Sequence, residues 1–318
     1  MSALNEVFSS LASVTFFVER ERGDVDIDFH LSGIYTERYK SYMENIAEIL
    51  KSILFGIVEG ITEWLPISST GHMILLNQFV TLDVTPEFWE MFLVVIQLGA
   101  ILAVVLLFWN KIFPFRFKEK PVIQKDIFVL WFKILVACIP AAVIGLAFDD
   151  VFEALFYNPW CVAIALIVFG VAFIVVENKN KNITPKITTL GSITYRTAFI
   201  IGIFQLIAAI FPGTSRSGAT IVGALLIGVS RTVAAEFTFF LAIPVMLGAS
   251  LLKLMKFGLH FTGEEAAILL TGMASAFIVS IIVIRFLMGY IKRHDFKVFG
   301  WYRIVLGVVV LLYFAFVG

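Results

Sequence analysis

The chain has 318 residues, of which 60% are apolar and 15% are charged, and its 24 basic and 24 acidic side chains balance to a formal net charge of zero. Soluble domains are nearer half apolar and a quarter charged. This composition therefore excludes a soluble domain and predicts a polytopic membrane protein. The balanced charge gives no sign of nucleic-acid binding, and no nucleic-acid partner is expected. Cys138 and Cys161 lie in apolar runs, which predicts small packing residues instead of a disulfide or a zinc site.

Residues 1–43 differ from the rest of the chain. They mix acidic and basic side chains with apolar runs that are too short to span a bilayer. They also lack the basic segment, apolar run and small-residue cleavage site of a secretory signal peptide. We therefore expect an N-terminal extension outside the membrane core, disordered or dispensable, with the membrane pattern beginning at Met43.

Residues 44–177 are predicted to form a re-entrant hairpin and three membrane spans. A helix that ends near Leu65 and an arm over 73–80 flank Pro66 and a polar turn. The apolar part of the first arm covers about 20 Å, short of a bilayer core of about 30 Å, and a polar turn at that depth needs protein or water around it. Full spans follow at 88–109, 128–148 and 160–176. Pro140 is expected to kink the second span, which an acidic loop over 149–159 follows.

Residues 178–318 repeat this plan. Short arms over 195–211 and 219–228 flank the polar turn 212–218, and spans follow at 234–255, 266–288 and 298–317. A constant offset of 146 places the first half on the second without a gap, which indicates an internal repeat. The matched pairs include Gly56 and Gly202, Pro66 and Pro212, Ser69 and Ser215, and Glu90 and Glu236.

The predicted fold class is an all-α polytopic membrane protein with an inverted-topology repeat, six transmembrane helices and two re-entrant helical hairpins. Because each half has three spans, the halves must enter the membrane from opposite sides. Loops 110–126, 178–196 and 289–297 are rich in Lys and Arg, whereas loops 81–87 and 149–159 have none. The positive-inside rule then places the basic loops in the cytoplasm, so that the first hairpin enters from the outside.

The first hairpin carries two carboxylates, Glu59 and Glu63, within one helical turn. At this spacing they lie on one helix face, about 6 Å apart. An ionisable group at bilayer depth costs about 2.5–3.5 kcal/mol, whereas an apolar residue returns only about 0.3–0.6 kcal/mol. Both carboxylates therefore need a cation, an arginine or water as a partner. This indicates a functional site in which both are candidate metal ligands.

The tips of the two hairpins are predicted to meet and to form an anion site. Each turn is followed by a helix N-terminus, whose free N–H groups attract anions, and Arg216 adds a planar fork suited to phosphate oxygens. A phosphate beside two carboxylates requires a divalent cation between them. The hydroxyl of Ser69 or a neighbour, near the imidazole of His72, supplies a nucleophile and a proton carrier, so the set suits phosphoryl transfer. The catalytic candidates are Glu59, Glu63, Ser69, His72 and Arg216, and the substrate-binding candidates are Ser68, Thr70, Gly71, Gln97, Thr214, Ser215, Ser217 and Gly218.

Plainer roles compete with these assignments. Serines and threonines at such turns often only cap helices. Gln205, which the offset places on Glu59, has a hydrogen bond to another helix as its simplest role. Glu90 and Glu236 are expected in the first turn of a span, where the helix dipole favours acidic residues.

Two long segments carry a family resemblance. EGITEWLPISSTGH, residues 59–72, and PGTSRSGATI, residues 212–221, closely resemble the signature segments of the undecaprenyl-diphosphate phosphatase family, also known as bacitracin-resistance proteins. The likeness covers about residues 44–317. It implies a multi-pass enzyme of the bacterial cytoplasmic (inner) membrane that removes the terminal phosphate of undecaprenyl diphosphate and recycles the lipid carrier for peptidoglycan synthesis.

The resemblance also implies roles for individual residues. It makes Glu59 and Glu63 the family's acidic pair and His72 its histidine. It further implies a divalent cation, Mg or Ca, as cofactor. The hydroxyl cluster would be Ser68, Ser69 and Thr70, and the phosphate-binding arginine would be Arg216, flanked by Ser215 and Ser217.

Alternatives stay open at this level. A polyprenyl-phosphate transporter or flippase would also use an inverted repeat with a midplane anion site, although it would not need a hydroxyl and a histidine beside two acids. Another class of lipid phosphatase would need a second motif histidine that is not found here. The nucleophile that attacks the diphosphate is either Ser69 or water. The sequence also leaves the oligomeric state open, with a homodimer among the options.

Overall fold

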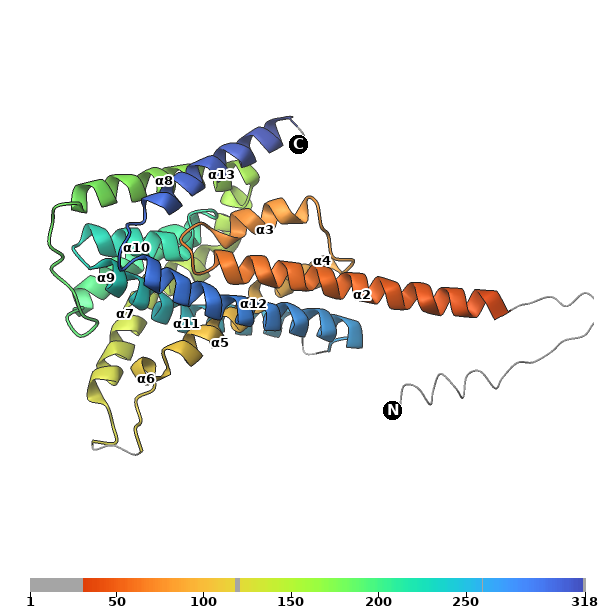
Figure 1. Cartoon of the computed structure of the whole chain (residues 1–318), viewed down its shortest axis with the longest axis horizontal. Helices are drawn as coiled ribbons and strands as arrows, with labels where there is room; N and C mark the ends of the chain where they lie inside the picture. Colours follow the sequence, from red (N-terminus) through yellow and green to blue (C-terminus); the bar gives the residue numbers. More distant parts are fainter. Residues whose placement is uncertain (1–30, 118–120, 259, 317–318) are drawn as a thin grey trace, which may run out of the picture. The chain divides into compact units, whose positions relative to one another are not determined.

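The structure is a computed structural model that describes residues 31–117, 121–258 and 260–316. The chain divides into two compact units, Met1–Ile46 and Ala47–Gly318. In the described residues the regular structure is helical, with only two isolated β-bridges (Figure 1). The helices are α2 (Leu31–Thr62), α3 (Ser69–Asn77), α4 (Pro86–Val95), α5 (Gln97–Leu107), α6 (Trp109–Ile112), α7 (Lys125–Phe156), α8 (Pro159–Asn180), α9 (Tyr195–Ile210), α10 (Arg216–Leu226), α11 (Arg231–Phe257), α12 (Gly263–Tyr290) and α13 (Lys297–Phe316).

Six helical segments of the described chain are long and apolar enough to cross a membrane. This confirms the predicted all-α class and the predicted number of spans. The first segment is made of α4 and α5, which are interrupted only at Ile96, directly before Gln97. The segments are Pro86–Leu107, Lys125–Gly145, Pro159–Asn180, Arg231–Phe257, Gly263–Tyr290 and Lys297–Phe316.

The first helix begins earlier than predicted. It starts at Leu31 instead of Met43, so the second part of the expected irregular extension is helical. Lys40 and Glu44 lie 3.9 Å apart at i, i+4 spacing, a contact that supports the helix at this exposed point. Residues 1–30 of the predicted extension lie outside the described residues.

The helix α7 also continues beyond its predicted end. The acidic segment expected to be a loop is helical as far as Phe156, and the break falls at Phe148, with φ −131°, instead of at Pro140. Phe148, Phe152 and Phe156 follow each other at i, i+4 spacing, with ring centroids 6.0 and 6.5 Å apart. This aromatic row supports a helix in a segment whose acidic residues alone suggest a loop.

Small residues set the closest helix crossings. A Cβ atom on Gly56 of α2 would lie 2.2 Å from the carbonyl oxygen of Gly272 in α12, and one on Gly202 of α9 would lie 2.3 Å from that of Ala137 in α7. Such close backbone approach is typical of helix packing in membranes. The helices α2 and α9, which precede the two polar turns, therefore each pack against a helix from the other half of the chain. The helices α8 and α13 also lie side by side (Figure 1).

The helix α11 packs against α4 and α5, and ion pairs join the two halves near both of its ends. Lys253 Nζ lies 3.1 Å from Glu90 Oε2, and Lys111 Nζ lies 2.7 Å from Glu236 Oε1. The expectation that both glutamates lie in the first turn of a span is wrong, because neither belongs to the first turn of its helix. They lie one turn deeper, where a lysine from the other half is in reach.

Candidate active site

The tips of the two polar turns, which precede α3 and α10, share one backbone conformation. Ser68 is the N-cap of α3 with φ 73° and ψ 101°, and Ser215 is the N-cap of α10 with φ 68° and ψ 121°. Each hydroxyl accepts a hydrogen bond from a glycine N–H, at 3.4 Å from Gly71 and at 3.2 Å from Gly218. A positive φ at a non-glycine residue costs about 1–3 kcal/mol and persists where the surroundings enforce it. Among the described residues only these two serines have it, so backbone strain is concentrated at the tips.

The caps correct the repeat alignment at the turns. Ser68 and Ser215 are equivalent by conformation and differ by 147 positions (215 − 68), whereas the constant offset of 146 paired Ser69 with Ser215. The second turn therefore has one extra residue between its proline and its cap. Gly213 accommodates it with φ +90°, since a Cβ there would lie 2.5 Å from the carbonyl oxygen of Val162. Ser69 and Arg216 consequently occupy equivalent positions, each the first residue of its helix.

Glu63 joins the two turns. Its Oε1 accepts a hydrogen bond from Nη2 of Arg216 at 2.7 Å, and its Oε2 accepts one from the hydroxyl of Ser69 at 2.8 Å. Ser217 donates its hydroxyl to the backbone carbonyl of Glu63 at 3.2 Å. The side chains of Glu63 and Arg216 are only 8% and 13% exposed, and at such burial an ion pair needs good geometry and further hydrogen bonds. The structure thus brings these four predicted site residues together.

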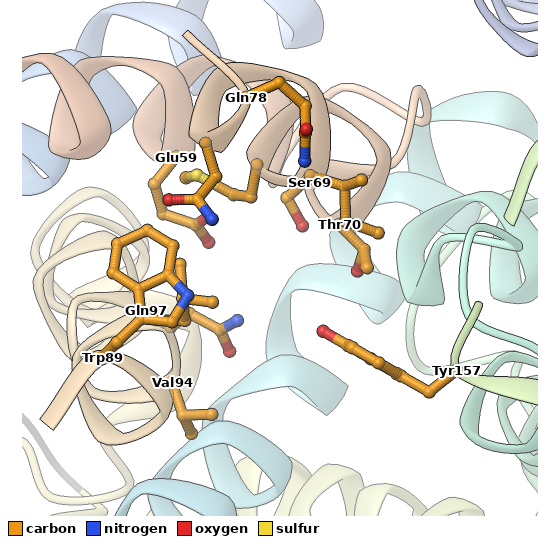
Figure 2. A pocket seen from close by; sticks show the side chains of 12 residues that line it. Glu59, Ser69, Thr70, Gln78, Trp89, Val94, Gln97 and Tyr157 are labelled. Atoms are coloured by element: carbon orange, nitrogen blue, oxygen red, sulfur yellow. The ribbon is translucent and has the colours of Figure 1, made fainter. Parts of the chain in front are cut away.

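A cavity of about 350 Å³ opens beside this cluster (Figure 2). Glu59 on its wall is 1% exposed, and its Oε1 has no hydrogen-bond partner within the described parts of the chain. Figure 2 shows Gln97 and Ser69 around the same space, with the hydroxyl of Tyr157 pointing in from the opposite side. A buried carboxylate oxygen without a partner is costly, so this is the place where a cation or a ligand donor would be most stabilising. The lining residues are Glu59, Ser69, Thr70, Met73, Ile74, Asn77, Gln78, Trp89, Leu93, Val94, Gln97 and Tyr157.

His72 does not line this cavity. Its Nδ1 lies 2.7 Å from the carbonyl oxygen of Ser68, and its Nε2 lies 2.7 Å from the hydroxyl of Tyr302 in α13. Both ring nitrogens therefore have partners other than the hydroxyl of Ser69, which donates to Glu63. The predicted contact between a nucleophilic hydroxyl and the imidazole is not formed here.

The remaining predicted residues lie around the two tips. Thr70 and Gln97 line the cavity. Ser215 and Ser217 hydrogen-bond to each other through their hydroxyls at 3.1 Å. Thr214 is fully buried, and no residue that the structure describes hydrogen-bonds to its hydroxyl. These hydroxyls therefore surround the N-terminus of α10, where an anion is attracted.

Gln205 of α9 is the residue that the offset of 146 pairs with Glu59. It is 2% exposed, and neither its amide oxygen nor its amide nitrogen has a hydrogen-bond partner among the described residues. The expected hydrogen bond to another helix is therefore wrong. Because the amide is neutral, α9 has no counterpart of the carboxylate pair that precedes the first turn.

Sequence reasoning missed Arg303, whose guanidinium hydrogen-bonds to both turns. This α13 residue is fully buried, and its guanidinium donates hydrogen bonds to three turn carbonyls, those of Pro66 at 3.2 Å, Gly213 at 3.0 Å and Thr214 at 2.7 Å. Its Nε also donates to the carbonyl of Leu166 in α8 at 3.4 Å. The signal for it was available, since a guanidinium inside an apolar span is by default a functional-site candidate.

Aromatic residues at the site were missed for a different reason. Trp89, Tyr157 and Tyr302 all lie near the ends of apolar segments, where tryptophan and tyrosine are common in any membrane protein. Their residue type alone therefore gives no sign of a functional site. Only the packed structure shows that Trp89 and Tyr157 line the cavity and that Tyr302 contacts His72.

Comparison with known proteins assigns the family. Residues 52–309 match the family of bacitracin resistance protein BacA. The chain is 69% identical over 270 residues to the undecaprenyl-diphosphatase of Desulfitobacterium hafniense, an alignment that covers 85% of this chain and 97% of that protein. It is 68% identical over 275 residues to undecaprenyl-diphosphatase 1 of Clostridium acetobutylicum (86% of this chain and 100% of that protein), and 64% identical over 267 residues to the undecaprenyl-diphosphatase of Enterococcus faecalis (83% and 96%). With its six apolar helices and both signature turns in place, this chain belongs to the BacA bacitracin resistance family.

Proposed function

We propose that the chain hydrolyses undecaprenyl diphosphate to undecaprenyl phosphate and inorganic phosphate in a bacterial cytoplasmic membrane, which recycles the lipid carrier for cell-wall synthesis and gives resistance to bacitracin. The names of the relatives support the reaction, and the six apolar helices support the membrane setting. The observation that carries the chemistry is the carboxylate of Glu63 held between Arg216 and Ser69, beside the unpartnered oxygen of Glu59.

The size of the cavity fits the headgroup and not the tail. A volume of about 350 Å³ accommodates a diphosphate but not a long polyprenyl chain. Withdrawing the tail from lipid costs about 0.8 kcal/mol per methylene. The tail therefore stays in the bilayer while the headgroup enters the cavity.

The donors around Glu59 fit a divalent cation. Mg²⁺ is usually held by one or two carboxylates together with substrate phosphates and water, and the described residues contain no closed group of three or more His, Cys, Asp or Glu. We assign Glu59, with its free Oε1, as the first ligand and Glu63, one helical turn away, as the second. When Mg or Ca is bound there, it neutralises the diphosphate and stabilises the charge that develops during transfer.

Glu63 and Arg216 change partners when the anionic headgroup enters. The guanidinium turns from the carboxylate to the oxygens of the terminal phosphate, which match its planar fork. The N-termini of α3 and α10 add backbone N–H groups from both turns. Oε1 of Glu63 is then free, while Oε2 remains in contact with the hydroxyl of Ser69.

The reaction proceeds in two displacements. Ser69 Oγ gives its proton to Glu63 and bonds to the terminal phosphorus, while the bond from that phosphorus to the bridging oxygen breaks and undecaprenyl phosphate leaves. Water then attacks the phosphorus of the phosphoserine, the bond from that phosphorus to Ser69 Oγ breaks, and inorganic phosphate leaves with both protons of the water, while the proton on Glu63 returns to Ser69 Oγ. Glu63 is the base in this sequence because it is the group that already accepts the hydrogen bond of Ser69.

A Ser69→Ala variant tests the covalent route. It is expected to turn over at least about 100-fold more slowly, because the attacking oxygen is lost, and to give no acid-stable phosphoprotein after quenching with labelled substrate. Ser192→Ala, which changes an exposed loop serine, is the matched control and is expected to behave like the wild type. A Ser69→Ala rate close to that of the wild type would instead mean that water attacks the diphosphate directly.

Phosphate release tests the function itself. Purified protein with a long polyprenyl diphosphate and Mg or Ca is expected to release inorganic phosphate. A chelator is expected to stop the release, and excess cation to restore it, because two carboxylates and a diphosphate cannot share a site without a cation. Movement of the lipid between leaflets of a vesicle without phosphate release would support the transporter, and no release with any divalent cation would refute the hydrolase.

We also infer that the halves form an inverted repeat with re-entrant hairpins. Two observations support this. The helix before each turn packs closely against a helix of the other half, α2 against α12 and α9 against α7. An ion pair also joins the two halves near each end of α11. Single cysteines introduced at 81–87 and at 110–116, in a chain without its own cysteines, are expected to react from the outside and from the inside respectively. Labelling of both loops from one side would contradict this topology.

A further inference from the structure

His72 faces away from the cavity. At about 100° per residue, the cavity-lining residues of α3 occupy one side of the helix, and His72 lies about 130° from the centre of that side. Its ring stacks on the ring of Tyr302 in α13, with centroids 5.6 Å apart and planes 5° from parallel. The lining residues of α3 are Ser69, Thr70, Met73, Ile74 and Asn77.

The hydrogen bonds of the imidazole define its tautomer. The carbonyl oxygen of Ser68 can only accept, so Nδ1 of His72 must carry the hydrogen of that 2.7 Å contact. In the neutral ring Nε2 then accepts from the hydroxyl of Tyr302, also at 2.7 Å. The single donor and the single acceptor of the imidazole are both used, and neither reaches the nucleophilic hydroxyl.

The carbonyl that His72 holds belongs to the strained residue of the turn. Ser68 has φ 73°, is 1% exposed and directly precedes Ser69. A backbone in this conformation needs surrounding contacts to persist. Ser69 meanwhile has Glu63 as its hydrogen-bond acceptor at 2.8 Å, so the attack needs no second base.

We propose that His72 and Tyr302 are positioning residues that keep Ser68 in its strained conformation and thereby aim Ser69, and that His72 carries no proton in the reaction. This assignment rests on the proposed phosphatase function. Tyr302 fixes the ring by stacking and by its hydroxyl, the ring fixes the Ser68 carbonyl, and the carbonyl fixes the first residue of α3. The proton of Ser69 passes to Glu63 alone.

A comparison of His72→Asn with His72→Ala separates positioning from proton transfer. The asparagine amide can donate to the carbonyl of Ser68 but does not titrate near neutral pH, so His72→Asn is expected to retain at least about a tenth of kcat with the pH profile of the wild type. His72→Ala is expected to lose about 100-fold, as misplacement of a reacting group does. If His72 were the acid or base, both variants would lose about 10²–10⁴-fold together with one limb of the pH profile.

Tyr302→Phe tests the second half of the pair. The ring remains but the hydrogen bond to Nε2 is lost, so kcat is expected to fall severalfold, with no further fall when Tyr302→Phe is added to His72→Ala. Tyr313→Phe is the matched control on the same helix, because the contacts of Tyr313 are those of its ring with Phe79 and Phe314, which the change keeps. Equal effects of the two tyrosine changes would refute a role for the Tyr302 hydroxyl.

The tautomer gives a measurement that does not depend on turnover. The chain has four histidines, so a ¹⁵N-histidine NMR spectrum of the full protein can be assigned for His72 by its loss in His72→Asn. The ring is expected to show a protonated Nδ1 and an unprotonated Nε2, unchanged by a non-hydrolysable diphosphate. The opposite tautomer, or a change on ligand addition, would overturn the positioning role. A wild-type protein that releases no phosphate would instead refute the proposed function, and the tautomer would still decide the role of His72.

Discussion

An Arg216→Ala variant is expected to release phosphate from polyprenyl diphosphate about 10³–10⁵-fold more slowly than the wild type, because an arginine that stabilises a transferring phosphoryl group contributes about that much to kcat. The change also leaves Glu63, whose side chain is 8% exposed, without the cation 2.7 Å away. The uncompensated carboxylate would then repel the headgroup, so KM is expected to rise as well. The measurement is kcat and KM of the purified variant with saturating Mg or Ca.

Two further variants show that the loss comes from chemistry and not from misfolding. Arg216→Lys keeps a charge but not the planar fork, so its rate is expected to lie between those of the wild type and Arg216→Ala. Arg196→Ala removes an exposed arginine from the first turn of α9 and is expected to leave the rate unchanged. Combining Arg216→Ala with Glu63→Gln is expected to recover thermal stability without activity, because no unpaired buried charge remains. A rate for Arg216→Ala within about tenfold of the wild type would contradict the assigned site.

The spans could be predicted because membranes impose a simple rule. A helix must be apolar over about 30 Å, and six such segments appear in the sequence within a few residues of their bounds in the structure. The rule does not apply outside the apolar core, where packing and side-chain contacts determine the ends of a helix. The early start of α2 at Leu31 and the continuation of α7 to Phe156 both lie in such polar segments.

The charged pair of the site could be predicted for the same energetic reason. Glu63 and Arg216 cannot remain unpaired in an apolar chain, and they are 2.7 Å apart in the structure. The direction of His72 could not be predicted, because it depends on which side of α3 packs against α13. The sequence also could not reveal that Ser68 and Ser215 are equivalent. The prolines Pro66 and Pro212 are 146 positions apart, whereas the two cap serines are 147 apart (215 − 68).

An Arg303→Met variant is expected to unfold at a much lower temperature than the wild type. The guanidinium is fully buried and donates to the carbonyls of Pro66, Gly213 and Thr214. Each buried carbonyl that loses its donor costs about 1–3 kcal/mol, a large share of the roughly 5–15 kcal/mol that separates folded from unfolded proteins. A fall of about 10 °C or more in the unfolding midpoint is expected, measured with purified protein in detergent.

Two further variants separate the alignment of the turns from general stability. Arg285→Met removes an exposed arginine from α12 and is expected to leave the midpoint unchanged. Arg303→Lys keeps the charge but offers a compact ammonium in place of the fork, and cannot reach the carbonyls of both turns at once. It is therefore expected to fold but to turn over slowly, because Ser69 and Arg216 then sit on turns that move independently and lose their mutual alignment. If Arg303→Lys matched the wild type in rate, the two turns would have to be aligned by the contact between Glu63 and Arg216 alone.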